Sequence, residues 1–298
     1  MQSRNPVFAR AEGFNGRSNS YGNPTYAGNG QTYAGYGDPS TWGTGTPGAP
    51  GAPVPPTHTQ ASSGPMTIDS VVQKTAITIG VTILAAAVTW LGTKGIDLGK
   101  NADGTANMEA VKTLGGLAMA GAILGFVLSM VNSFKRVVSP PLVLAYAVCE
   151  GVFIGAMSKT FEAMWPGIVL GAVLGTFAAV GGTLAAYRFF NIKVGDRFRK
   201  WVTAAMFGFV GVVVLDFVLG LFGNAIGFND LHGLGFVMSL IGLGLGVLLL
   251  ILDFDYVERG IAAGLPEQES WRAAFGLTVT IVWIYIELLR ILAALRNN

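Results

Sequence analysis

The chain has 298 residues, of which 51% are hydrophobic and only 12% charged, whereas a soluble domain carries roughly 25% charged residues. This composition, with a mean hydropathy of +0.53, is that of a membrane protein. The net charge of +2 is too small to indicate nucleic acid as a partner.

Residues 1–68 form a predicted disordered, cytoplasmic tail rich in glycine, tyrosine and proline. The tail contains the imperfect repeat TYAGNG and TYAGYG, followed by GTGTPGAPGAPVPP. Such a segment lacks the apolar side chains whose burial would offset the loss of chain entropy on folding. We assign no chemistry to it.

Residues 69–298 are predicted to form one membrane domain. From Thr75 onward, apolar runs recur that are near the roughly 20 residues a helix needs to cross the hydrocarbon core. The sequence therefore predicts an all-α integral membrane protein, a bundle of seven transmembrane helices. The predicted spans are residues 75–91, 114–131, 142–157, 165–187, 202–222, 234–252 and 275–295. The third is short, and the seventh is interrupted by Glu287 and Arg290.

Basic residues are biased toward one side of the predicted bundle. Ten lie on the side of the tail and five on the opposite side. Because short cytoplasmic loops carry the excess of lysine and arginine, this bias predicts a cytoplasmic tail. Seven spans then place the C-terminus on the opposite side, unless the last segment is re-entrant. The ten are Lys74, Lys135, Arg136, Arg188, Lys193, Arg197, Arg199, Lys200, Arg259 and Arg272, and the five are Lys94, Lys100, Lys112, Lys159 and Arg296.

Five acidic residues lie within or at the end of predicted spans: Glu150, Asp216, Asp253, Asp255 and Glu287. An ionised group at the centre of a bilayer costs on the order of 2.5–3.5 kcal/mol on insertion scales. Each of these residues therefore needs a structural or a functional explanation.

The spacing of the charged residues separates their expected roles. Asp253 and Asp255 are about 200° apart around a helix, so they face nearly opposite sides. Asp255 can pair with Arg259 four residues later, and Glu287 can pair with Arg290 three residues later. Asp253 is interpreted as an anchor in the headgroup region. The Glu287 pair suits either a structural or a functional role.

Three stretches of the membrane domain resemble one family. They are SPPLVLAYAVCEGVFIGAMSKTFE, LDFDYVERG and VWIYIELLRIL. Together with the order of the spans, they make residues 70–298 similar to the Bax inhibitor/YccA-type family, also called the transmembrane Bax-inhibitor-motif family. The opening RNPVF and the tail resemble a bacterial branch. The resemblance implies a bundle with the last helix at its centre, in the bacterial plasma membrane.

The same resemblance implies a gate. In that family, an acidic residue on each of the last two spans forms a pair viewed as a pH-sensing, cation-binding gate for calcium leak. Two carboxylates a few ångströms apart cannot both ionise at low cost, so protonation switches the pair between a hydrogen-bonded closed state and a repelling open state.

Carried over residue by residue, the resemblance gives Asp255 the gate position on the sixth span, where it would also ligate Ca²⁺. Glu150 takes the place of a buried acid on the third span. The second gate position falls at Thr280, which cannot ionise. Glu287 or Asp216 is then left to partner Asp255.

Two functions follow as hypotheses. The first is a passive, pH-modulated cation (Ca²⁺) leak channel, with Asp255, Glu150, Glu287 and Asp216 along the path and Arg290 holding a closed-state ion pair. It needs no cofactor, and Ca²⁺ is the permeant or bound ion. The alternative is a regulatory protein that binds and restrains a membrane protease or another membrane protein, with the tail as the presented segment. Besides such a partner, the lipid bilayer is expected to surround the domain.

An enzymatic function is not predicted. Cys149 is the single cysteine, and the two histidines, His58 and His232, lie far apart in the sequence, whereas the paired histidines of a zinc hydrolase lie on one helix face. An intramembrane protease needs two acids that face each other across helices, and Thr280 removes the better candidate.

Overall fold

The computed structural model describes residues 64–96, 107–224, 226–228, 230–231 and 233–297. Most of the predicted disordered tail, residues 1–63, lies outside the described residues, as do His58 and His232. The remaining residues form the membrane domain, to which the description below refers.

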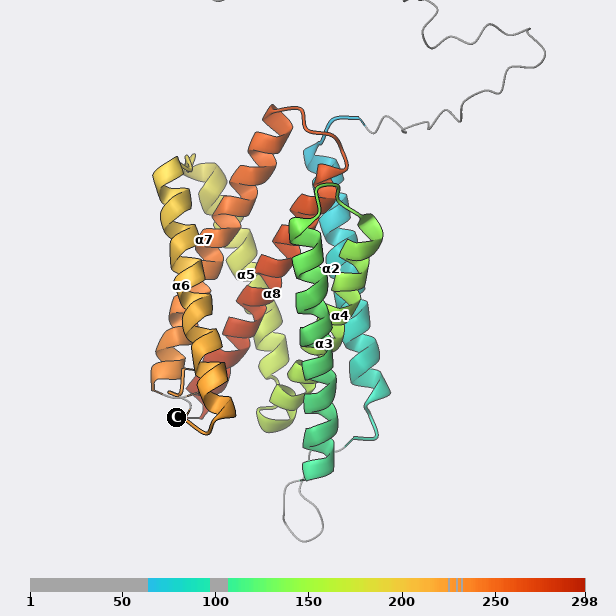
Figure 1. Cartoon of the computed structure of the whole chain (residues 1–298), viewed down its shortest axis with the longest axis vertical. Helices are drawn as coiled ribbons and strands as arrows, with labels where there is room; N and C mark the ends of the chain where they lie inside the picture. Colours follow the sequence, from blue (N-terminus) through green and yellow to red (C-terminus); the bar gives the residue numbers. More distant parts are fainter. Residues whose placement is uncertain (1–63, 97–106, 225, 229, 232, 298) are drawn as a thin grey trace, which may run out of the picture. The chain divides into compact units, whose positions relative to one another are not determined.

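Seven helices, each long and apolar enough to cross a membrane, make up the described part of the chain (Figure 1). This confirms the predicted all-α, multi-pass membrane fold. The helices are α2 (Ile68–Gly92), α3 (Met108–Phe134), α4 (Pro140–Met164), α5 (Ile168–Phe189), α6 (Asp196–Leu221), α7 (Leu234–Ala262) and α8 (Glu269–Arg296).

The last helix, α8, is the central one, as predicted. Within the apolar part of α8, 61% of the residues are buried inside the protein, against 17–39% in the other six helices. It packs against α2, α4, α5 and α7, whereas α3 packs only against α4 among the described helices. α6 packs mainly against α7, and its Phe209 ring also contacts Trp283 of α8. The outer helices leave many large apolar side chains exposed, which is typical of helices that face lipid.

Contacts at both ends of α8 show that it runs through the whole bundle. Near its start, Ser270 shares a hydrogen bond of 2.7 Å with Ser70 in the first turn of α2. At its end, the Arg296 guanidinium donates to the Pro166 carbonyl between α4 and α5. The helix is therefore not re-entrant, and its C-terminal end lies opposite the start of α2 (Figure 1).

Two helices extend well past the ends of their predicted spans, because the charged residues there have partners within the protein. α4 continues beyond residue 157, and the Lys159 ammonium donates to the carbonyl and hydroxyl oxygens of Thr93. α7 continues beyond residue 252 through Asp253 and Asp255, both of which are hydrogen-bonded. An apolar run ends at its first charged residue, but a helix continues where that charge is paired.

A short segment, residues 64–67, fastens the start of α2 to the turn between α7 and α8. The Met66 N–H donates to the Leu265 carbonyl (2.7 Å), and the Glu267 N–H donates to the Gly64 carbonyl (2.9 Å). The Met66 side chain is only 1% exposed. Lys74, nearly two turns into α2, forms an ion pair of 2.8 Å with Glu267. Residues 64–67, which the composition assigned to the tail, therefore pack against the membrane domain.

The N-terminus of α2 is set by its cap. The Thr67 hydroxyl accepts from the Ser70 N–H, and the Ser70 hydroxyl accepts from the Thr67 N–H, both at 3.1 Å. This reciprocal pair satisfies two N–H groups that the first helical turn leaves without partners. The helix therefore begins at Ile68, although the apolar run begins seven residues later.

The buried Met66 side chain gives the first prediction. We expect Met66→Ala to lower the free energy of unfolding by about 2–5 kcal/mol, because it leaves a cavity in a closed part of the core. Ile68→Ala is the matched control, since Ile68 is 61% exposed, and it should change that free energy by less than about 0.5 kcal/mol. Unfolding in detergent, followed by circular dichroism, measures both. Equal effects of the two substitutions would show that the Met66 side chain does not fasten residues 64–67 to the turn between α7 and α8.

Candidate functional site

Polar residues of α7 and α8 meet along one line, here called the α7–α8 seam. On α7, Ser239, Gly242 and Asp253 lie within about 60° of one another around the helix. On α8, Thr280 and Glu287 are seven residues apart, which places them about 20° apart and roughly 10 Å apart along the axis. The seam therefore has two polar levels, one at Asp253 and one at Glu287.

At the first level, Asp253 faces Thr280 across the two helices. The Thr280 hydroxyl donates to the Asp253 carboxylate with an oxygen–oxygen distance of 2.6 Å. Thr280 is 6% exposed, and Asp253 is half-buried. Asp253, not Asp255, is thus the carboxylate opposite the second gate position. The carboxylate interpreted from its position as a headgroup anchor is thus hydrogen-bonded within the protein.

At the second level, Glu287 is enclosed by both helices. The residue is 4% exposed, hydrogen-bonded to Ser239 and 3.5 Å from the Arg290 guanidinium. Arg290 also donates to the Phe228 carbonyl in the connection between α6 and α7 (3.1 Å). The predicted ion pair of Glu287 and Arg290 is therefore present. Arg290 thereby joins α8 to the connection that precedes α7.

Close packing separates the two polar levels. Leu250 of α7 and Ile284 of α8 are both fully buried. Gly246 lies so close to α8 that a Cβ there would come within 2.9 Å of the Ile284 side chain. The Trp283 indole donates to the Gly242 carbonyl (3.0 Å). These contacts leave the seam closed between Asp253 and Glu287.

Asp255 faces away from the seam and joins α6 to α7. Its carboxylate is 2.7 Å from the Arg199 guanidinium and 2.9 Å from that of Arg259, and Arg259 also donates to the Val194 carbonyl. The predicted pairing with Arg259 is confirmed. The gate position assigned to Asp255 by resemblance is not, because a rotation of about 200° separates Asp255 from Asp253.

The surroundings of Asp255 do not suit a bound Ca²⁺. Calcium takes six to eight oxygen ligands, several of them carboxylates, whereas the Asp255 carboxylate is engaged by two guanidinium groups. No group of three or more His, Cys, Asp and Glu side chains gathers anywhere in the described ranges. In the described state, the carboxylate expected to ligate Ca²⁺ is paired with Arg199 and Arg259.

Asp216 and Glu150 lie apart from the seam. Asp216 is 2% exposed and accepts from the N–H groups of Ile226 (2.7 Å) and Gly227 (3.1 Å). It therefore orders the connection between α6 and α7. Glu150 lies on α4 where α3 approaches it, since a Cβ at Gly125 would come within 3.2 Å of its carboxylate. Neither residue reaches Asp255 in the manner of a gate partner.

Three contributors to these clusters were missed from the sequence. Ser239 and Gly242 make room for Glu287, and Arg199 pairs with Asp255 across two helices. A signal was present for the first two, because both recur on the Asp253 face of α7 at helical spacing. Arg199 gave no such signal, since its distance from Asp255 depends on how α6 is rotated.

The glycine beside Glu287 gives the second prediction. A Cβ at Gly242 would lie 2.6 Å from the Glu287 carboxylate and 3.0 Å from the Phe209 ring, whereas a Cβ at Gly244 would meet nothing within 4 Å. We expect Gly242→Ala to lower the free energy of unfolding by about 1–3 kcal/mol through overpacking. The control Gly244→Ala should leave it unchanged or raise it by up to about 1 kcal/mol. Thermal unfolding in detergent compares them, and identical midpoints would contradict the tight seam.

The ion-pair cluster at Asp255 gives the third prediction. We expect Asp255→Asn to lower the free energy of unfolding by about 1.5–3 kcal/mol, because charged hydrogen bonds to two guanidinium groups are lost. The effect stays below that of a fully buried pair, since the Arg199 and Arg259 side chains are 45% and 49% exposed and water screens them. Asp69→Asn, on the exposed first turn of α2, should cost less than about 1 kcal/mol. A wild-type midpoint for Asp255→Asn would remove the structural role.

Comparison with known proteins extends the resemblance seen in the sequence. The profile of the family described as "Bax inhibitor 1 like" matches residues 5–297, so the match includes the tail as well as the region 70–298. A Chlamydia muridarum protein, named only as an uncharacterized protein, is 25% identical over 158 residues. Those residues are 51% of this chain and 64% of that protein, less than two thirds of its length. Because the family profile matches nearly all of it, this chain belongs to the Bax inhibitor 1 like family.

Proposed function

We propose that the protein is a passive, proton-modulated cation leak of the plasma membrane, and that ions cross along the α7–α8 seam. The observation that carries the proposal is the half-buried Asp253, whose carboxylate accepts a hydrogen bond from Thr280 across the seam. A second carboxylate, Glu287, lies on the same face two turns away. Acidic residues buried in this way within membrane helices are typical of ion pathways.

The residues of the seam would act in sequence on a cation. Asp253, when ionised, attracts a cation into the first level, where the Thr280 hydroxyl supplies a second oxygen ligand. The buried Glu287 is the next acidic group, but Arg290 neutralises it at 3.5 Å. Passage then requires α7 and α8 to separate at Gly246 and Ile284. The described state is therefore a closed one.

Proton control in this chain rests on one carboxylate. Thr280 cannot ionise, so no proton is shared between two acids at this level. A proton instead competes with the cation for Asp253. Raising the pH ionises Asp253 and restores the attraction for the cation. We therefore expect a larger flux at pH 8 than at pH 6.

The basic residues support an orientation in which the end of the bundle bearing residues 64–67 faces the cytoplasm. This part of the proposal follows from the ten basic residues on that side. The proposal assigns the protein no catalytic reaction. The alternative function, restraint of a membrane protease, depends on the tail, most of which lies outside the described residues.

The fourth prediction tests the leak directly. Purified protein is reconstituted into liposomes that contain a Ca²⁺-sensitive dye, and Ca²⁺ entry is recorded at pH 6 and pH 8. We expect wild type to pass more Ca²⁺ at pH 8 and Asp253→Asn to lose both the flux and its pH dependence. Glu109→Gln, which removes an exposed acid on the first turn of α3, is the matched control and should behave as wild type.

Two outcomes would contradict the proposal in different ways. A wild-type flux no greater than that of empty liposomes at both pH values would remove the leak function. A flux that keeps its pH dependence in Asp253→Asn would leave a leak but move the path away from the seam. In that case the flux of Asp255→Asn is measured at both pH values and scaled to the amount of folded protein. A loss of pH dependence in this variant would assign the response to the ion-pair cluster at Asp255.

A further inference from the structure

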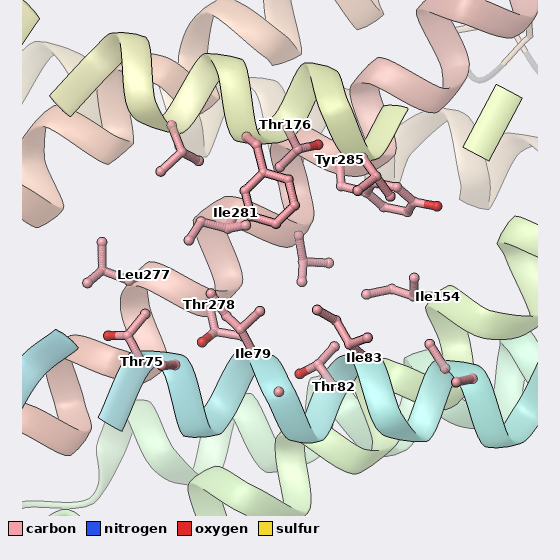
Figure 2. A pocket seen from close by; sticks show the side chains of 18 of the residues that line it. Thr75, Ile79, Thr82, Ile83, Ile154, Thr176, Leu277, Thr278, Ile281 and Tyr285 are labelled. Atoms are coloured by element: carbon pink, nitrogen blue, oxygen red, sulfur yellow. The ribbon is translucent and has the colours of Figure 1, made fainter. Parts of the chain in front are cut away.

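On the side of α8 away from α6, a long groove separates α2 from α5. Its volume is about 1000 Å³, its walls come from α2 and α5, and its floor comes mainly from α8 (Figure 2). The two walls do not contact each other, so the groove opens to the lipid. Figure 2 shows Thr75 and Leu277 near one end and Ile154 and Tyr285 near the other.

The surface of the groove is hydrocarbon. Of the hydroxyl groups that line it, those of Thr82, Thr176 and Thr278 donate to carbonyls of their own helices. The hydroxyls of Ser158 and Tyr285 bond to each other at 2.7 Å. The hydroxyl of Thr75, near one end of the groove, has no hydrogen-bond partner among the described residues. These five bonded hydroxyl groups therefore offer an occupant no polar partner along the rest of the groove. A polar solute would lose its hydrogen bonds with water without replacement, which leaves an apolar ligand.

The length of the groove indicates an elongated ligand. The α2 residues that line the groove run from Val71 to Leu91, or about 30 Å along the helix, the thickness of the hydrocarbon core. A narrow ligand whose length equals the depth of one leaflet would occupy half of the length of the groove.

The charge at one end of the groove indicates the headgroup. Arg188 lies in the last turn of α5 and is exposed. It follows Phe177, a wall residue, by eleven residues, so it lies on the same face of α5 within about 20°. A guanidinium at this level suits a phosphate of an anionic lipid.

We propose that the groove binds one acyl chain of an anionic phospholipid from the leaflet at the start of α2, with its phosphate at Arg188. The chain lies along α2 from Val72 to about Gly80, which is roughly the depth of one leaflet. The lipid holds α2 and α5 apart over α8. The inference rests on the groove alone and is independent of any ion flux along the seam.

Gly80 allows the groove to be filled without disturbing the fold. A Cβ there would meet nothing within 4 Å, so the side chain of Gly80→Leu extends into the groove. Gly211→Leu is the matched control, because a Cβ at Gly211 on the outer face of α6 also meets nothing within 4 Å. Ala76→Leu, one turn before Gly80 on the same wall, is a second groove variant in case the first does not fold.

The fifth prediction is tested by native mass spectrometry of protein extracted in mild detergent from vesicles of palmitoyl-oleoyl phosphatidylglycerol. We expect wild type and Gly211→Leu to retain one lipid, and both groove variants to lose it. In vesicles that mix this lipid equally with phosphatidylethanolamine, Arg188→Gln should lose the preference for phosphatidylglycerol.

Three results would overturn the proposal. Wild type without a bound lipid would show that the groove exchanges lipid as freely as the rest of the surface. Equal lipid retention in wild type and in the folded groove variants would place the lipid elsewhere. A second copy of the chain, bound in wild type and lost in Gly80→Leu, would make the groove an interface between protomers.

Discussion

The close approach of α7 to α8 is the constraint on which the rest of the bundle depends. Helices in lipid gain little from a hydrophobic drive between them, so they associate by close packing and by hydrogen bonds. Gly242 and Gly246 supply that packing on α7, and the indole of Trp283 bonds to the main chain at Gly242. Once α8 is fixed against α7, its remaining surface receives α2, α4 and α5. The outer helix α3 packs against α4 alone among the described helices, and α6 packs mainly against α7.

A second constraint acts on the acidic residues. Because each ionised group inside a bilayer is costly, each must meet a donor or a cation. The five acids do so separately: Asp253 with Thr280, Glu287 with Ser239 and Arg290, Asp255 with two arginines, Asp216 with main-chain N–H groups, and Glu150 with Tyr146. Only Asp253 and Glu287 share a seam. Because the acids have separate partners, most of them have structural roles. The proposed function therefore rests on the pair of helices α7 and α8.

The sequence was informative wherever an argument stayed within one helix. It predicted the seven helices and the pairings at three and four residues, Glu287 with Arg290 and Asp255 with Arg259, because these depend only on helical geometry. The central place of α8 came from the family resemblance. Pairings between helices were not predictable in this way. A shift of one residue along a helix changes the direction of the side chain by about 100°, so a small error in register changes the partner. Asp255 is only two residues from Asp253, yet it lies on the opposite side of α7, paired with Arg199 and Arg259 instead of facing Thr280. The end of α4 was missed because Lys159 finds its acceptor 66 residues away.

The segment at residues 64–67 has a mechanical consequence. It pairs its main chain with Leu265 and Glu267, in the turn that connects the two helices of the seam, and it lies directly before α2. A displacement of residues 64–67 therefore reaches that turn through two main-chain hydrogen bonds and the Lys74 ion pair. The start of α2 and the turn between α7 and α8 are thus mechanically coupled.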